Sequence, residues 1–139
     1  MTKVLIQWAF DIFHNWHALT LQYAKRFWDE LIVALNTNPL IKDYKNKIAV
    51  QDWKYKKSLL ESIRYVDKVI SADNFSPMEL LKDNDIDVYV VWSEWVDSHP
   101  EEIRYMEEKW WKVVVCPRWK SCTSTSAIKK ILLEEATNK

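Results

Sequence analysis

Two histidines three residues apart, His14 and His17, lie between an apolar run that ends near Ile6 and a segment with helical periodicity. This spacing places both imidazoles near the N-terminus of the following helix, where free backbone N–H groups and the helix dipole favour an anion. Two imidazoles there can donate hydrogen bonds to a phosphate and stabilise charge on a phosphoryl oxygen during its transfer. The spacing also fits a metal site, for which no third ligand is placed to help, or two residues that bind nothing.

Further candidates for phosphate binding follow later strands. Lys45 and Lys47 belong to a predicted loop, Lys42–Lys47, and lysines can hold phosphates as mobile point charges. Ser124 and Thr125 open the last predicted helix, whose N-terminus forms a second anion site. Taken alone, a lysine-rich loop is more often a solvated surface, and Ser124 is equally well explained as a plain N-cap.

Composition limits the class of protein. A chain of 139 residues is the size of one domain, and its 20 basic and 20 acidic residues leave no positive field for duplex nucleic acid. No apolar run reaches the roughly 18 residues that span a bilayer, and the N-terminus lacks a secretory signal. We therefore expect a cytoplasmic protein that binds neither nucleic acid nor membrane, with Cys116 and Cys122 as reduced thiols.

Short apolar runs alternate with amphipathic segments along the whole chain, which predicts the elements that position these side chains. The predicted strands are Val4–Ile6, Leu31–Leu35, Lys68–Ile70, Val88–Val91 and Lys112–Val115. The predicted helices are about His17–Phe27, Asp52–Ile63, Met78–Lys82, Pro100–Lys109 and Ser124–Glu135. This order favours a single-domain α/β fold with a Rossmann-like, doubly wound, parallel five-stranded sheet. Such sheets bind ligands at the carboxyl ends of their strands.

The stretch from Trp8 to His17 resembles the G-T/A-F-D-x-x-H-x-G-H segment of the HxGH nucleotidyltransferases, most nearly the glycerol-3-phosphate cytidylyltransferase type. Every position fits except the two glycines. Further similar segments are Trp28 to Ala34 (G-D-x-L-I-V-A), Ile63 to Ile70 (I-R-Y-V-D-x-V-I), Val91 to Trp95 (G-D-D-W), and Cys116 to Arg118 with Ser124 to Ser126 (P-R-T-x-G-I-S-T-T). Together these segments span nearly the whole chain.

The resemblance implies an enzyme that transfers a nucleotidyl group, most simply CMP from CTP, to a small phosphorylated alcohol such as glycerol 3-phosphate, with release of pyrophosphate. It implies Mg²⁺ as cofactor, held by Asp11, and a homodimer. The implied catalytic residues are His14, His17, Lys45 and Arg118; the implied nucleotide-binding residues are Ala9, Phe10, Asp11, Lys47, Arg64, Glu94, Trp95, Ser124 and Thr125. Without the resemblance, Arg64 is a surface ion pair and Trp95 an ordinary packing residue.

Two other functions stay open at this point. The stretch from Ser76 through Pro100–Glu102 to the predicted turn at Trp110–Val114, with Cys122 before the hydroxyl cluster, is similar to adenylyltransferases that use ATP and a sugar phosphate. A non-catalytic nucleotide-binding protein is the other alternative, and it depends on the tryptophans.

Tryptophan and glycine usage is abnormal in this chain. Average usage predicts roughly ten glycines, but there are none, while there are nine tryptophans. Seven of these stand at glycine positions of the family or in turns, namely Trp8, Trp16, Trp28, Trp92, Trp110, Trp111 and Trp119. We hypothesise that these seven represent glycine, as when UGA codons for glycine are read as tryptophan. Two rival explanations are deliberate Gly→Trp substitution and a natural protein that tolerates the indoles. The UGA hypothesis does not explain why ordinary glycine codons are also absent.

Overall fold

The computed structural model describes residues 2–26, 29–109, 112–116 and 124–137. Within these ranges, residues 93 and 94 are described by their backbone only. Five strands form one parallel sheet in the order β3-β2-β1-β4-β5. They are β1 (Lys3–Trp8), β2 (Glu30–Asn36), β3 (Lys68–Ala72), β4 (Val88–Trp92) and β5 (Lys112–Cys116). The α/β fold with a parallel five-stranded sheet is therefore confirmed.

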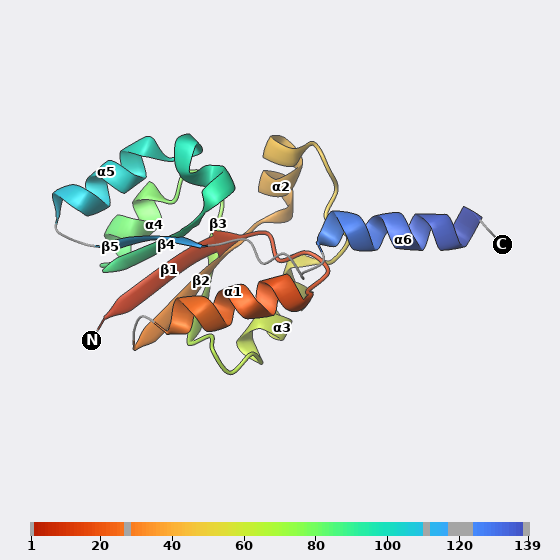
Figure 1. Cartoon of the computed structure of the whole chain (residues 1–139), viewed down its shortest axis with the longest axis horizontal. Coiled ribbons are helices and arrows are strands. Elements are labelled where there is room, and N and C mark those ends of the chain that lie inside the picture. The colour runs from red at the N-terminus through yellow and green to blue at the C-terminus, as the bar shows by residue number, and fades with distance from the viewer. Residues whose placement is uncertain (1, 27–28, 110–111, 117–123, 138–139) are drawn as a thin grey trace.

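Successive side chains along each strand point to opposite faces of the sheet, so the core has two layers. Val4, Ile6 and their equivalents on β2 pack against α1 (Asn15–Lys25) and α3 (Trp53–Glu61). Leu5 and its equivalents face α4 (Met78–Asp83) and α5 (Pro100–Glu108) on the other side. Figure 1 shows these two helical layers below and above the sheet. Because both faces are covered, the strands are apolar at nearly every position.

The strand order places a topological switch at β1. The chain winds outward from β1 to β2 and β3, then returns to place β4 on the other side of β1. β1 therefore pairs with β2 from Lys3 to Trp8, and with β4 from Val4 to Ile6. Loops that leave β1 and β4 diverge to opposite faces at this point, which opens a crevice at their carboxyl ends.

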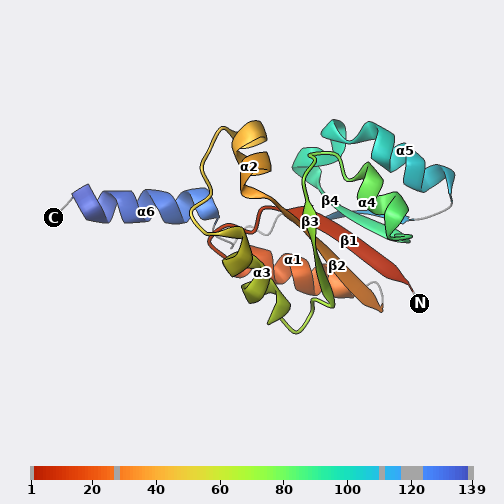
Figure 2. The ribbon, with the colours of Figure 1, turned by 180° about the vertical axis from the view of Figure 1, so that it is seen from behind.

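Two helices lie beyond the carboxyl ends of the strands. The final helix, α6 (Thr125–Thr137), extends away from the sheet, as both views show (Figures 1 and 2), and none of its residues is buried. The other, α2 (Asn38–Lys45), corrects the prediction of a loop at Lys42–Lys47. Pro39 starts this eight-residue helix and Asn46, in the left-handed region, ends it, so only the stretch from residue 46 onward is loop.

The remaining elements lie close to their predicted bounds. The strands extend by one or two residues beyond the predicted ranges, and α1 begins at Asn15 rather than His17. A 3₁₀ turn, Ser93–Ser98, follows β4, in a stretch for which the sequence predicted no helix or strand. No described helix is long and apolar enough to cross a membrane.

Candidate active site

A cavity of about 330 Å³ opens at the carboxyl ends of β1 and β4. Its walls come from the β1–α1 junction, the end of α2 with the loop that follows it, the 3₁₀ turn and the first turns of α6. The cavity is lined by Trp8, Ala9, Phe10, Asp11, His14, Trp16, His17, Ile41, Lys45, Lys47, Ile48, Ala49, Trp92, Trp95, Ser124, Thr125, Ser126 and Lys129. Ten of the thirteen predicted site residues are among them: Ala9, Phe10, Asp11, His14, His17, Lys45, Lys47, Trp95, Ser124 and Thr125.

The two histidines form a stacked pair at the start of α1. The Nδ1 atom of His14 accepts a hydrogen bond from the Trp16 backbone N–H (3.2 Å), so this imidazole caps the helix. The Nδ1 atom of His17 accepts in turn from the His14 backbone N–H (3.3 Å). Their ring centroids lie 3.8 Å apart at 19°. Because each Nδ1 is an acceptor, the proton of each neutral ring is on Nε2, which stays available as a donor.

Both imidazoles are held in the neutral form. Burial lowers the pKa of His17 to about 2, helped by repulsion from His14, Lys45 and Lys56. Burial also lowers the pKa of His14. At neutral pH the pair therefore presents two N–H donors without positive charge.

Positive charge in the cavity comes from lysines instead. Lys45 ends α2, Lys47 lies in the loop after it, and Lys129 lies on the first turns of α6. The sequence analysis found the first two and missed Lys129, whose only sequence signal was its place one turn after the hydroxyl residues. Three cations from three segments around two imidazole donors suit a polyanion such as a triphosphate.

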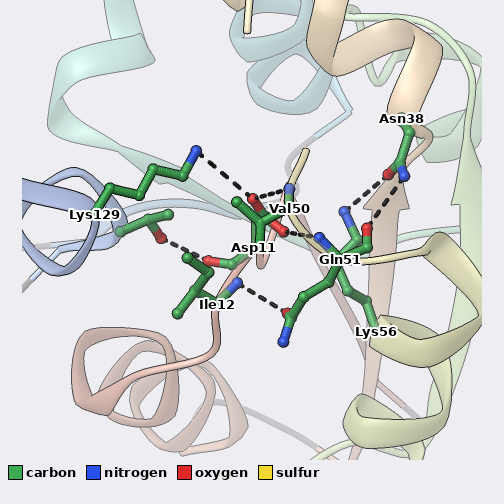
Figure 3. A network of polar contacts seen from close by, with 8 residues as sticks. Asp11, Ile12, Asn38, Val50, Gln51, Lys56 and Lys129 are labelled. Atoms are coloured by element: carbon green, nitrogen blue, oxygen red, sulfur yellow. Dashed lines mark hydrogen bonds and ion pairs between the residues drawn. The ribbon is translucent and has the colours of Figure 1, made fainter. Parts of the chain in front are cut away.

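Asp11 lines the cavity, and its carboxylate is bonded to groups of the protein. Its Oδ2 accepts from the Val50 backbone N–H (2.8 Å) and its Oδ1 from the Gln51 backbone N–H (2.9 Å), as Figure 3 shows. The Lys129 ammonium lies 3.9 Å from Oδ2. These bonds use one acceptor position of each oxygen, and carboxylates that bind metals are commonly hydrogen-bonded as well, so the metal role of Asp11 stays a prediction. Among the described residues, no group of three acidic, histidine or cysteine side chains could hold an ion.

The hydroxyl residues of α6 have local hydrogen bonds. Ser124 accepts from the Ala127 backbone N–H (3.1 Å), so it acts as the cap of α6, one of the two explanations given for it above. Thr125 donates from its Oγ1 to the Asp11 carbonyl oxygen (2.6 Å). These bonds fasten the start of α6 to the β1–α1 junction and hold both side chains at the cavity wall.

Aromatic side chains form the far wall. Trp95 lines this cavity and a smaller one of about 30 Å³ beside it. Its ring packs edge-on against Phe75 at 5.4 Å. Trp95 is thus a half-buried packing residue that also lines the cavity, which is compatible with contact to a nucleotide base.

Three of the seven suspect tryptophans meet inside the cavity. The centroid of Trp8 lies 5.5 Å from that of Trp16 and 4.3 Å from that of Trp92, and Trp16 and Trp92 lie 5.0 Å apart. Trp8 also abuts the ring of His17 at 4.3 Å. The indole Nε1 of Trp92 is buried without a hydrogen-bond partner among the described residues. These indoles fill space next to the imidazole donors. Trp28, Trp110, Trp111 and Trp119 lie outside the described residues.

The structure does not bring Arg64 to this cavity. Arg64 precedes β3, at the amino ends of the strands, and its guanidinium donates to the Tyr65 hydroxyl (2.6 Å). The triphosphate contact predicted for Arg64 stays a prediction. Arg118 lies outside the described residues, and so does the side chain of Glu94.

Comparison with known proteins places this chain in a family. A family model described as cytidylyltransferase-like matches residues 9–131, nearly the whole chain. The chain belongs to this family. The match includes every residue that lines the cavity described above except Trp8. Membership makes the chain a nucleotidyltransferase.

Individual relatives agree with the family. The glycerol-3-phosphate cytidylyltransferase of Bacillus subtilis is 36% identical over 96 residues, covering 68% of this chain and 74% of that protein. The one from Bacillus spizizenii is 32% identical over 131 residues, covering 94% and 96%. In structure, the chain is similar to the lipopolysaccharide core biosynthesis protein of Thermoplasma volcanium, with a TM-score of 0.75 over 86% of this chain and 99% of that one, at 20% identity. That likeness concerns the fold alone.

The neutral state of His17 predicts how stability depends on pH. Because its folded pKa of about 2 lies below the ordinary 6.5, the unfolded chain binds more protons between these values. The free energy of unfolding therefore falls as the pH is lowered from 6.5, by up to about 1.4 kcal/mol per pH unit for this group. Urea unfolding at pH 7.5, 6.5 and 5.5 measures the slope. His17→Gln should flatten it, and equal slopes for both proteins would contradict the assignment.

Proposed function

We propose that this nucleotidyltransferase transfers CMP from CTP to a small phosphorylated alcohol such as glycerol 3-phosphate, with release of pyrophosphate. The observation that carries the proposal is the stacked pair of neutral imidazoles, with free Nε2–H donors, in a cavity that three lysines line. The choice of CTP and of a glycerol phosphate is supported by the relatives named glycerol-3-phosphate cytidylyltransferase, at 32–36% identity.

The reaction is an in-line displacement at phosphorus. A phosphate oxygen of the acceptor attacks the α-phosphorus of CTP and forms the new P–O–P bond. The bond between the α-phosphorus and the bridging oxygen to the β-phosphate breaks, and its electron pair leaves with pyrophosphate. No covalent intermediate with the enzyme is needed, so catalysis consists of positioning and electrostatic stabilisation.

His14 and His17 act on the phosphoryl group that is transferred. Negative charge moves onto the non-bridging and leaving oxygens in the transition state, and two fixed N–H donors stabilise that charge without reorganising. Since both rings are neutral, they serve as donors and not as general acids at neutral pH. The backbone N–H groups at each Nδ1 fix the tautomer, so the Nε2–H group is the donor of each ring, and both residues line the cavity.

Lys45, Lys47 and Lys129 hold the β- and γ-phosphates in this proposal. Their charges meet the triphosphate already in the ground-state complex, so they contribute mainly to binding. Mg²⁺ remains part of the proposal: bound together with the triphosphate, it would offset the negative charge of the phosphate oxygens. Trp95, half-buried at the far wall, is proposed to border the base.

The three indoles at Trp8, Trp16 and Trp92 bear directly on this function. They occupy volume beside the imidazole donors that phosphate oxygens would need. We therefore propose that these positions are glycine in the protein made by its source, since only glycine leaves the backbone open to close approach by a phosphate. If the indoles are native, the non-catalytic alternative replaces the enzymatic one for this chain.

Nucleotide choice is the first test of this proposal. With glycerol 3-phosphate as acceptor, and glycine at positions 8, 16 and 92, we expect faster turnover of CTP than of ATP. Release of pyrophosphate measured with each triphosphate gives the ratio. A clear preference for ATP together with a sugar phosphate would instead support an adenylyltransferase.

The histidines should govern the rate more than binding. In the same glycine-bearing protein, His14→Ala and His17→Ala should each lower kcat by about 10²–10³, because each removes one preorganised donor. Triphosphate affinity, measured by calorimetry, should change much less. Lys45→Ala should instead weaken triphosphate binding, while Lys54→Ala on the exposed face of α3 should change neither quantity. Near-normal turnover in both histidine variants would make the pair structural.

The tryptophan proposal predicts a gain of binding on substitution. Calorimetric titration with CTP should show little binding to the tryptophan-bearing chain and clear binding once Trp8, Trp16 and Trp92 are replaced by glycine. Trp53→Gly, which removes an indole from α3 outside the cavity, is the control and should restore nothing. Protein purified from its source should also have an intact mass well below 16.7 kDa. A mass equal to that value would overturn the proposal.

A further inference from the structure

Two loops about 40 residues apart in sequence are joined by reciprocal hydrogen bonds. The Asp11 carboxylate accepts the backbone N–H groups of Val50 (2.8 Å) and Gln51 (2.9 Å). The Gln51 side-chain oxygen Oε1 accepts the Ile12 backbone N–H (2.9 Å) in return. Each loop thus caps the backbone of the other, and Figure 3 shows the two side chains crossing between them.

The same two residues connect further elements. The Asn38 side chain donates to the Gln51 carbonyl oxygen (3.1 Å) and accepts from the ammonium of Lys56 (3.0 Å), which is fully buried on α3. On the other side, the Asp11 carbonyl oxygen accepts from Thr125 of α6. The starts of α2 and α6 and the buried face of α3 are therefore all bonded to one small network.

The backbone at Asp11 needs such support. Its neighbours Phe10 and Ile12 have φ of 49° and 50°, in the left-handed region that costs an ordinary residue about 1–2 kcal/mol. Ile12 is β-branched, for which this conformation is especially unfavourable. The hydrogen bond from its N–H to Gln51, together with the burial of Asp11, holds the turn in place.

We infer that Asp11 and Gln51 are positioning residues, a clamp that fixes the loop after α2 against the β1–α1 junction. The clamp sets Lys45 and Lys47, on one side, at the correct reach from His14 and His17 on the other. This inference rests on the proposed function for the role of those four side chains. It gives Asp11 a positioning role instead of the metal-binding role that the resemblance implies, because each carboxylate oxygen accepts a backbone N–H of the loop.

Hydrogen exchange on the unaltered chain and its variants tests the clamp without needing activity. Gln51→Met keeps the length of the side chain but removes the acceptor, so the amide of Ile12 and the peptide over residues 46–52 should exchange at least about tenfold faster. Gln51→Glu keeps an acceptor oxygen and should retain more of the protection.

Asp11→Asn leaves one accepting oxygen for two N–H groups and should also raise exchange. Asp43→Asn, the same change on the exposed face of α2, should have no effect. Unchanged exchange in Gln51→Met and Asp11→Asn would overturn the clamp.

Kinetics then separate positioning from metal binding. In the glycine-bearing enzyme, Gln51→Met should raise KM for the triphosphate by about tenfold, the equivalent of one lost hydrogen bond, with kcat changed less. Asp11→Asn should raise KM in the same way while leaving the Mg²⁺ concentration for half-maximal rate unchanged. A shift of that concentration by tenfold or more would make Asp11 a metal ligand and refute the inference. If the enzyme turns over no triphosphate at all, the proposed function fails, while the exchange result still decides whether the clamp exists.

Discussion

The hydrogen bond from the Trp16 backbone N–H to the His14 imidazole is the interaction on which the site depends. The first N–H groups of any helix have no partner within the helix, and these groups need an acceptor. Serine, threonine or aspartate usually supplies one, but a carboxylate cap has nothing left to donate. An imidazole accepts at Nδ1 and still donates at Nε2. The N-cap of α1 is therefore also a functional group, and His17 repeats the arrangement by accepting from the backbone of His14.

The body of the domain and its functional edge are stabilised by different forces. Between the two helical layers, the strands bury Val4, Leu5 and their equivalents by apolar packing on both faces. At the carboxyl edge of the sheet, side chain to backbone hydrogen bonds take over, from Asp11, Gln51, Asn38 and Thr125. Apolar packing is tolerant of small shifts, whereas these bonds are directional. Geometry is thus specified most tightly where phosphate oxygens would have to be placed.

Much of this architecture follows from the sequence because the signals are local. Apolar runs predicted the five strands. The segments that follow β1 and β2 meet the start of α6 because parallel strands end at one edge of the sheet. The helix α2 was missed because it is short and lies in a lysine-rich stretch. Arg64 lies away from the cavity because it precedes a strand, which puts it at the opposite edge of the sheet. The role of Asp11 was out of reach, since its partners are backbone N–H groups of residues 50 and 51, and a backbone amide leaves no mark on the sequence.

The neutral imidazoles have a consequence for the electrostatics of the cavity. Burial keeps His14 and His17 uncharged, so protons gained or lost near neutrality leave the charge of the donor pair as it is. The positive potential is supplied instead by the ammonium groups of lysines. Two of them, Lys47 and Lys129, reach the cavity from partly or fully exposed positions, where dissolved ions screen charge over about 8 Å at physiological ionic strength. Attraction of a polyanion to this edge of the sheet accordingly weakens as the salt concentration around the protein rises.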